Sequence, residues 1–109
     1  MTVREVVEKC GVLNVHQQRG ITDDYSELVF YSKEIDAWNK LFTDIFGPAI
    51  KPVGVKSSKD DLRLTKDYGG VNKNQTLFKK ELDDVKLIAM FWPWQDGIHT
   101  TLRIATLKK

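Results

Sequence analysis

Cysteine, histidine and proline are scarce in this sequence of 109 residues, which contains one, two and three of them. A single cysteine, Cys10, excludes an internal disulfide and any zinc site built on several cysteines. Neither His16 nor His99 has a second histidine or cysteine three or four residues away, so we expect no metal site. We also expect no cofactor and no catalytic residues, because no motif for either is present.

Long hydrophobic runs are absent too. The longest apolar stretch without a charged residue, 87–95, is far shorter than the roughly 20 apolar residues that span a bilayer. The first residues include acidic side chains and lack the apolar core of a signal peptide. We therefore expect a soluble, cytoplasmic protein with no membrane partner.

Charge of one sign is not in great excess, since the net charge is +2. Residues 1–50 carry five basic and eight acidic side chains, whereas residues 51–109 carry twelve and seven. This asymmetry is typical of a solvated surface, and it makes a nucleic-acid partner unlikely. The sequence is 41% hydrophobic and contains three Trp, five Phe and three Tyr, which excludes intrinsic disorder. We expect one domain over residues 1–109.

Three segments have the features of helices. Residues 2–10 begin with the capping pair Thr2 and Glu5, and their apolar side chains recur with helical spacing. Residues 35–46 carry one continuous apolar stripe that includes Trp38 and Phe42, and Gly47 follows as a stop signal. A third helix should begin after Ser58 and end near Gly69, with a thin apolar face that indicates a surface position.

Four stretches rich in β-branched and aromatic residues predict strands over residues 27–32, 75–82, 85–94 and 98–107. The last three are separated by Asp83-Asp84 and by Asp96-Gly97, a two-residue hairpin signal. We therefore predict an α+β fold in the order α-β-α-α-β-β-β. Its antiparallel sheet is a C-terminal three-stranded meander plus one edge strand, packed against two or three helices.

Two-residue turns would fix the register of this meander and place Glu81 opposite Lys86. One face of the sheet is then apolar almost throughout, and the helix that contains Trp38 should cover it. The other face includes Ile88, Met90, Trp92 and Trp94 on the central strand, too apolar a row for plain solvent. The 2–10 helix, a second subunit or a ligand could cover it.

Candidate catalytic and phosphate-binding features each have a simpler structural explanation. Cys10 could act as a nucleophile with His99 as its base, but it lies on the apolar stripe of the first helix and suits the core. The glycine-bearing loop 66–74 follows a helix, whereas phosphate loops precede one.

The second sheet face remains the best candidate for function. We expect a small non-enzymatic binding or interaction domain, homodimeric through Met90, Trp92, Trp94 and Arg103. The alternative is a small-molecule-binding protein or enzyme with a pocket near Trp92, Trp94, His99 and Arg103. Binding of single-stranded nucleic acid to the aromatic and basic side chains is a third hypothesis. The candidate ligand or partner-binding residues are Met90, Trp92, Trp94, His99 and Arg103.

Overall fold

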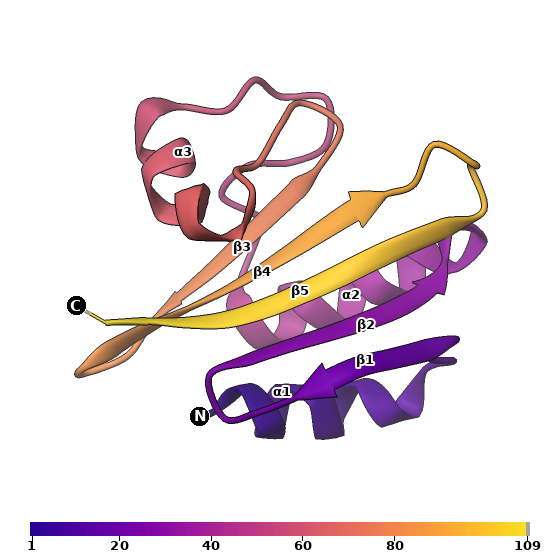
Figure 1. The fold of residues 1–109 in the computed structure, drawn as a ribbon, viewed down its shortest axis with the longest axis horizontal. Coiled ribbons are helices and arrows are strands. Elements are labelled where there is room, and N and C mark those ends of the chain that lie inside the picture. Colours follow the sequence, from indigo (N-terminus) through magenta and orange to yellow (C-terminus); the bar gives the residue numbers. More distant parts are fainter. Residues whose placement is uncertain (109) are drawn as a thin grey trace.

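The computed structural model describes residues 1–108 and shows an α+β fold built on a five-stranded antiparallel sheet with the strand order β1-β2-β5-β4-β3 (Figure 1). The strands are β1 (Gln17–Ile21), β2 (Tyr25–Tyr31), β3 (Thr76–Glu81), β4 (Val85–Pro93) and β5 (His99–Lys108). The α-helices are α1 (Val3–Lys9), α2 (Ile35–Phe46) and α3 (Lys59–Thr65), and the 3-10 turns are η1 (Cys10–Val12), η2 (Ser32–Glu34) and η3 (Lys66–Tyr68). None of the helices described is long and apolar enough to cross a membrane.

Helix α2 lies along one face of the sheet, which we call the first face (Figure 1). Its apolar stripe predicts this position, and Gly47 ends the helix with φ +84°. The Trp38 ring stacks on Phe30 with centroids 4.4 Å apart, and Phe42 meets Phe91 edge-on at 5.4 Å. The predicted core is confirmed, since both side chains are fully buried in one cluster with Phe78, Leu87, Ala89, Phe91 and Leu102.

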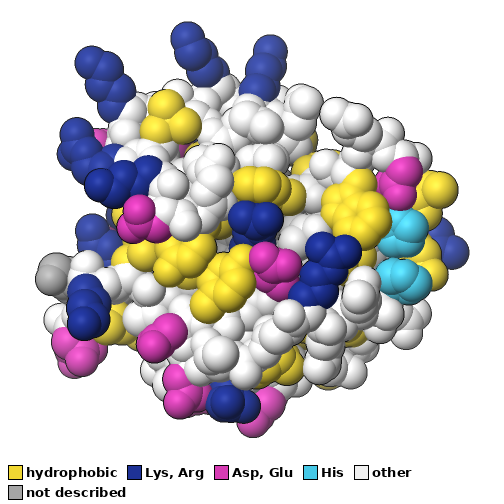
Figure 2. Space-filling view, in the orientation of Figure 1, with side chains coloured by type: hydrophobic (Ala, Val, Ile, Leu, Met, Phe, Trp, Pro, Cys, Tyr) yellow, Lys and Arg dark blue, Asp and Glu magenta, His cyan; other side chains and the backbone are white. Residues whose placement is uncertain are grey.

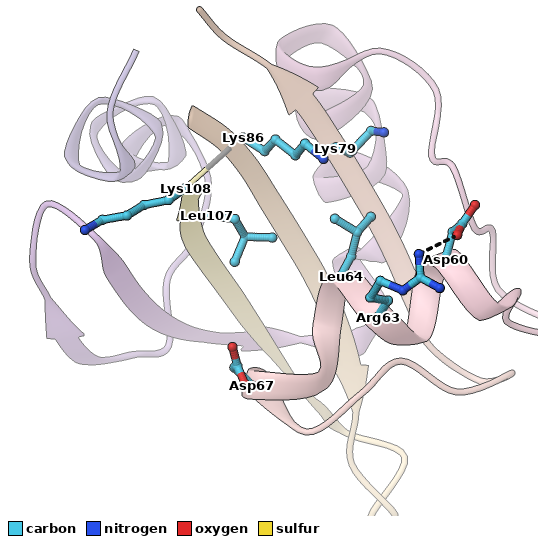
Figure 3. Close-up of a pocket in the computed structure, with 8 residues that line it drawn as sticks. All are labelled: Asp60, Arg63, Leu64, Asp67, Lys79, Lys86, Leu107 and Lys108. Atoms are coloured by element: carbon cyan, nitrogen blue, oxygen red, sulfur yellow. Dashed lines mark ion pairs between the residues drawn. The ribbon is translucent and has the colours of Figure 1, made fainter. Parts of the chain in front are cut away.

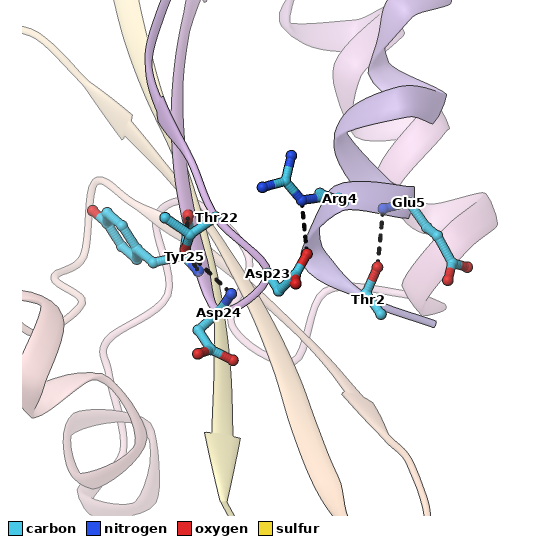
Figure 4. Close-up of polar contacts among 7 residues, drawn as sticks. All are labelled: Thr2, Arg4, Glu5, Thr22, Asp23, Asp24 and Tyr25. Carbon is cyan, nitrogen blue, oxygen red and sulfur yellow. Dashed lines mark hydrogen bonds and ion pairs between the residues drawn. The ribbon is translucent and has the colours of Figure 1, made fainter.

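Helix α1 packs on the same face. Thr2 caps it by accepting a hydrogen bond from the Glu5 N–H at 3.2 Å, and Val3 and Val6 are fully buried in the α2 core (Figure 4). Arg4 pairs with Asp23 of the β1–β2 turn at 2.7 Å (Figure 4). Both partners are largely exposed, so this pair contributes at most about 1 kcal/mol. The hypothesis that this helix covers the second face is therefore wrong.

The second face is covered instead by the chain between residues 57 and 75. Helix α3 begins with the predicted capping box, in which Ser58 and Asp61 exchange hydrogen bonds of 2.9 and 3.0 Å. The apolar cover comes mostly from the turn after the helix. Tyr68 and Val71 pack there against a second buried cluster formed by Leu77, Ile88, Met90 and Ala105.

A fully buried lysine holds this covering segment to the sheet. The Lys51 ammonium donates to the carbonyl oxygens of Pro52, Lys73 and Gln75, which satisfies its three N–H groups. Its backbone also pairs with Leu77, so that part of the outer edge of β3 is closed. Burial lowers the pKa of Lys51, and the nearby Asp61 carboxylate opposes that shift.

The predicted order lacks one strand. β1 was not predicted because its side chains are exposed except for a half-buried Ile21, so it shows no alternation of apolar and polar residues. It forms through backbone pairing with β2 and contains a bulge between Gln18 and Gly20. The strand predicted over residues 27–32 is therefore not at the edge. It corresponds to β2, which lies between β1 and β5.

The register of the meander is as predicted, but one turn is not. Glu81 pairs with Lys86, and Met90 pairs with Arg103. The β4–β5 connection is wider than a two-residue primed turn, because the described residues with positive φ are all glycines and Asp96 is not among them. The Trp94 N–H bonds the His99 carbonyl at 2.8 Å, and residues 95–98 form the loop.

Candidate functional site

The five predicted site residues lie in three different environments on the second face. Met90 is the first of them, and it is fully buried by its own chain in the cluster with Val71, Leu77 and Ile88. The expectation that it lies at a surface until a partner covers it is therefore wrong. Sequence reasoning identified the apolar row correctly but did not assign its cover to residues 57–75.

Trp92 and Arg103 form the second environment, where they hold the covering segment to the sheet. The Arg103 guanidinium lies 3.9 Å from the centre of the Trp92 ring and donates a 3.0 Å hydrogen bond to the Tyr68 carbonyl. Gly69 lies so close that a Cβ there would stand 2.5 Å from the Trp92 indole. These contacts attach the covering segment to β4 and β5, and both side chains are half-buried.

A polar network extends this contact across the sheet. Arg103 forms an ion pair of 3.6 Å with Glu27, which also accepts a hydrogen bond from the Tyr25 hydroxyl. The Tyr25 and Tyr68 rings stack with centroids 5.3 Å apart. Burial, followed by the hydrogen bond to Glu27, raises the pKa of Tyr25 above its ordinary value. The network therefore continues the attachment of the cover to β2.

Trp94 and His99 lie in the third environment, where they meet two further rings. We call His16, Tyr31, Trp94 and His99 the ring cluster. His99 is at its centre, with centroid distances of 4.8 Å to Trp94, 5.1 Å to His16 and 5.4 Å to Tyr31. Figure 2 shows the two histidines side by side on the surface, next to a hydrophobic ring. The fold thus brings together both histidines of the sequence, 83 positions apart.

Asp96 orients the central ring of this cluster. Its carboxylate lies 2.7 Å from His99 Nδ1 and accepts backbone hydrogen bonds from Ile98 and His99 at 2.8 and 3.1 Å. The His99 hydrogen bond, followed by those two N–H groups, lowers the pKa of Asp96 to about 2. Because an ionised carboxylate only accepts, Nδ1 carries a hydrogen and His99 is held in one orientation.

Two cations lie over the rings of the cluster. The Arg19 guanidinium is 5.2 Å from the Trp94 ring centre, and the Lys33 ammonium is 5.7 Å from that of Tyr31. A shallow hollow of about 300 Å³ adjoins them, lined by Tyr31, Lys33, Gly97 and Ile98. The site therefore offers aromatic faces, positive charge and a recess large enough for a side chain.

Sequence reasoning missed three members of this surface: His16, Arg19 and Tyr31. His16 and Arg19 lie in a segment without a motif, and Tyr31 lies on a predicted strand whose register with the meander was not predicted. Only the pairing of β1 with β2, and of β2 with β5, places them beside the β4–β5 loop. A prediction of β1 together with the β2–β5 register would have found them, since cross-strand neighbours follow from the register.

Other reactive groups are placed apart from this surface. Cys10 is fully buried in the core of the first face, so it cannot meet His99 on the second, and burial raises the pKa of its thiol to about 12. Within residues 1–108, no group of three or more His, Cys, Asp or Glu side chains is placed to hold a metal ion. The chain matches no protein-family model, no curated protein and no solved structure with which it was compared.

Proposed function

We propose that this protein is a small non-enzymatic interaction domain that binds its partner through the ring cluster. The observation that carries the proposal is the packing of four rings at the surface, with Arg19 over one of them. Tryptophan, tyrosine and arginine are the side chains enriched at the centres of protein interfaces. Rings that are held by one another and by Asp96 also lose little conformational entropy on binding.

The partner that we propose is a second copy of the chain, which would dock along β1. The sheet has one edge partly closed by the Lys51–Leu77 bridge and one edge at β1, its outermost strand. The ring cluster adjoins that second edge, because His16 immediately precedes β1. Arg19, whose guanidinium lies over Trp94, belongs to β1. Pairing two β1 strands would continue the sheet and bring the two ring clusters into one interface. Met90 takes no part in this proposal.

The experiment is sedimentation equilibrium on the wild-type protein and two charge-reversal variants. Arg19→Glu removes the cation over Trp94 at an exposed position, so it should weaken the dimer at least about tenfold without loss of stability. Lys40→Glu makes the same charge change on the exposed side of α2 and should leave the dimer unchanged. A wild-type protein that is a monomer at millimolar concentration, or equal weakening by both variants, would refute self-association through this surface.

A further inference from the structure

A groove at the other end of the second face has different chemistry from the ring cluster. It has a volume of about 500 Å³ and lies between α3 with η3 and the ends of the last three strands (Figure 3). Eight residues from Leu107 back to His99 separate the two surfaces by roughly 27 Å along β5. The groove is lined by Asp60, Arg63, Leu64, Asp67, Lys79, Lys86, Leu107 and Lys108.

The rim of the groove is cationic. Four of the lining residues are basic and two are acidic. Arg63 pairs with Asp60 at 3.6 Å, and Lys79 pairs with Glu81 at 3.3 Å. The first of these pairs is largely exposed and the second is partly so. Such pairs are weak in water, so an incoming anion can compete with the carboxylates for the same cations.

The floor of the groove is apolar. Leu64 and Leu107 point toward one another between the charged side chains in Figure 3, and both are half-buried. Leu107 packs against the buried cluster of the second face, so its position is fixed by the core. A free inorganic ion would contact only the rim, whereas a molecule with an apolar body would also cover the floor.

We propose that this groove binds a small organic anion, in which a carboxylate, sulfonate or phosphate group contacts the lysines and an apolar body contacts the two leucines. The volume falls within the range of small-molecule sites, roughly 300–1,000 Å³. The placement of Lys79 and Lys86 supports the proposal, because they come from the neighbouring strands β3 and β4 and their side chains lie beside one another on the second face (Figure 3). The site is independent of the ring cluster and of any dimer.

The test uses two fluorescent probes of similar shape. Anilinonaphthalene sulfonate is an anion, and N-phenyl-1-naphthylamine is its neutral counterpart. The wild-type protein should bind the anion more tightly than the amine. The double variant Lys79→Gln/Lys86→Gln should weaken binding of the anion about tenfold, because two nearby charges are lost, and should change binding of the amine much less. Leu64→Ser should weaken the binding of both probes, because both contact the apolar floor.

A matched control separates this site from general charge effects. Lys40→Gln/Lys73→Gln removes the same net charge from exposed positions outside the groove and should keep anion binding within about twofold of wild type. An equal loss of affinity for the anion in both double variants, or no loss of affinity in either, would overturn the proposal. If the first double variant unfolds, Lys86→Gln alone should still weaken binding of the anion about threefold. Trp94→Ala, which alters the ring cluster, should leave the probe bound.

Discussion

Gly69 lies against Trp92 so closely that a Cβ on the glycine would stand 2.5 Å from Cη2 of the indole. Gly69 also has φ +92° and ends η3 in the left-handed conformation. One residue thus allows both the reversal of the chain after η3 and the contact of the covering segment with β4. Gly70 has φ +74° as well, but a Cβ there would meet nothing within 4 Å.

Comparison of these two glycines separates steric overlap from backbone strain. Gly69→Ala should lower the free energy of unfolding by about 2–4 kcal/mol, because it adds a clash to the strain of a positive φ. Gly70→Ala should cost about 1 kcal/mol through strain alone. Denaturant unfolding of both variants measures the difference. Equal stabilities would mean that Trp92 moves aside easily and does not hold the cover.

The core of the first face should be sensitive to the loss of Phe42. This ring is fully buried and contacts Phe78 and Phe91, so Phe42→Ala should lower the free energy of unfolding by about 3–5 kcal/mol. Thr43→Ala, at an exposed position on the same helix, should change it by less than about 0.5 kcal/mol. A cost below about 1 kcal/mol for the Phe42 variant would contradict the packing of α2 on the sheet.

The buried Lys51 should stabilise the fold through its three carbonyl partners. Lys51→Met keeps the length of the side chain but leaves the carbonyls of Pro52, Lys73 and Gln75 without that donor, which should cost about 2–5 kcal/mol. Lys56→Met, at an exposed position, is the control and should be nearly neutral. Thermal unfolding followed by circular dichroism gives both values, and similar melting temperatures would show that the ammonium is dispensable.

Asp96 should contribute an acid-sensitive part of the stability. Its pKa is lowered from 3.8 to about 2 in the folded protein, so the unfolded state binds more protons between these values. The contribution is therefore complete above about pH 4 and is lost as the pH falls through 2. Denaturant unfolding at pH 5 and pH 2.5 measures how much of the free energy of unfolding is lost in acid. This loss should be smaller in Asp96→Asn than in the wild type. Asp44→Asn, on α2, is the control, and its free energy of unfolding should fall between pH 5 and pH 2.5 by the same amount as that of the wild type.

Cys10 should be inert in the native protein. Its thiol is fully buried, and burial raises its pKa to about 12, so the reactive thiolate is scarce at neutral pH. Ellman's reagent should react slowly with the folded protein and rapidly in concentrated denaturant. Rapid labelling in native buffer would mean that α1 separates readily from the first face.

Patterns within single segments were enough to predict much of this fold. The stripe of α2 and the capping box of α3 are local signals, because they depend on spacing along one element. The register that pairs Glu81 with Lys86 also follows from a short connection, and it correctly divided the meander into two faces. The apolar second face was likewise visible in the sequence as a row that could not be left in water.

Tertiary structure alone decided what covers that face and which rings remain at the surface. β1 has almost no buried side chain, so its sequence shows no alternation of apolar and polar residues. It is held to β2 by backbone hydrogen bonds, which a sequence pattern does not predict. Without β1, the contact of His16 with His99 cannot be foreseen, because 83 residues separate them and β2 positions both. The sequence by itself determined where the apolar surface would be. Long-range packing determined that Met90 is core, that Trp92 contacts the covering segment, and that Trp94 and His99 remain half-buried at the surface.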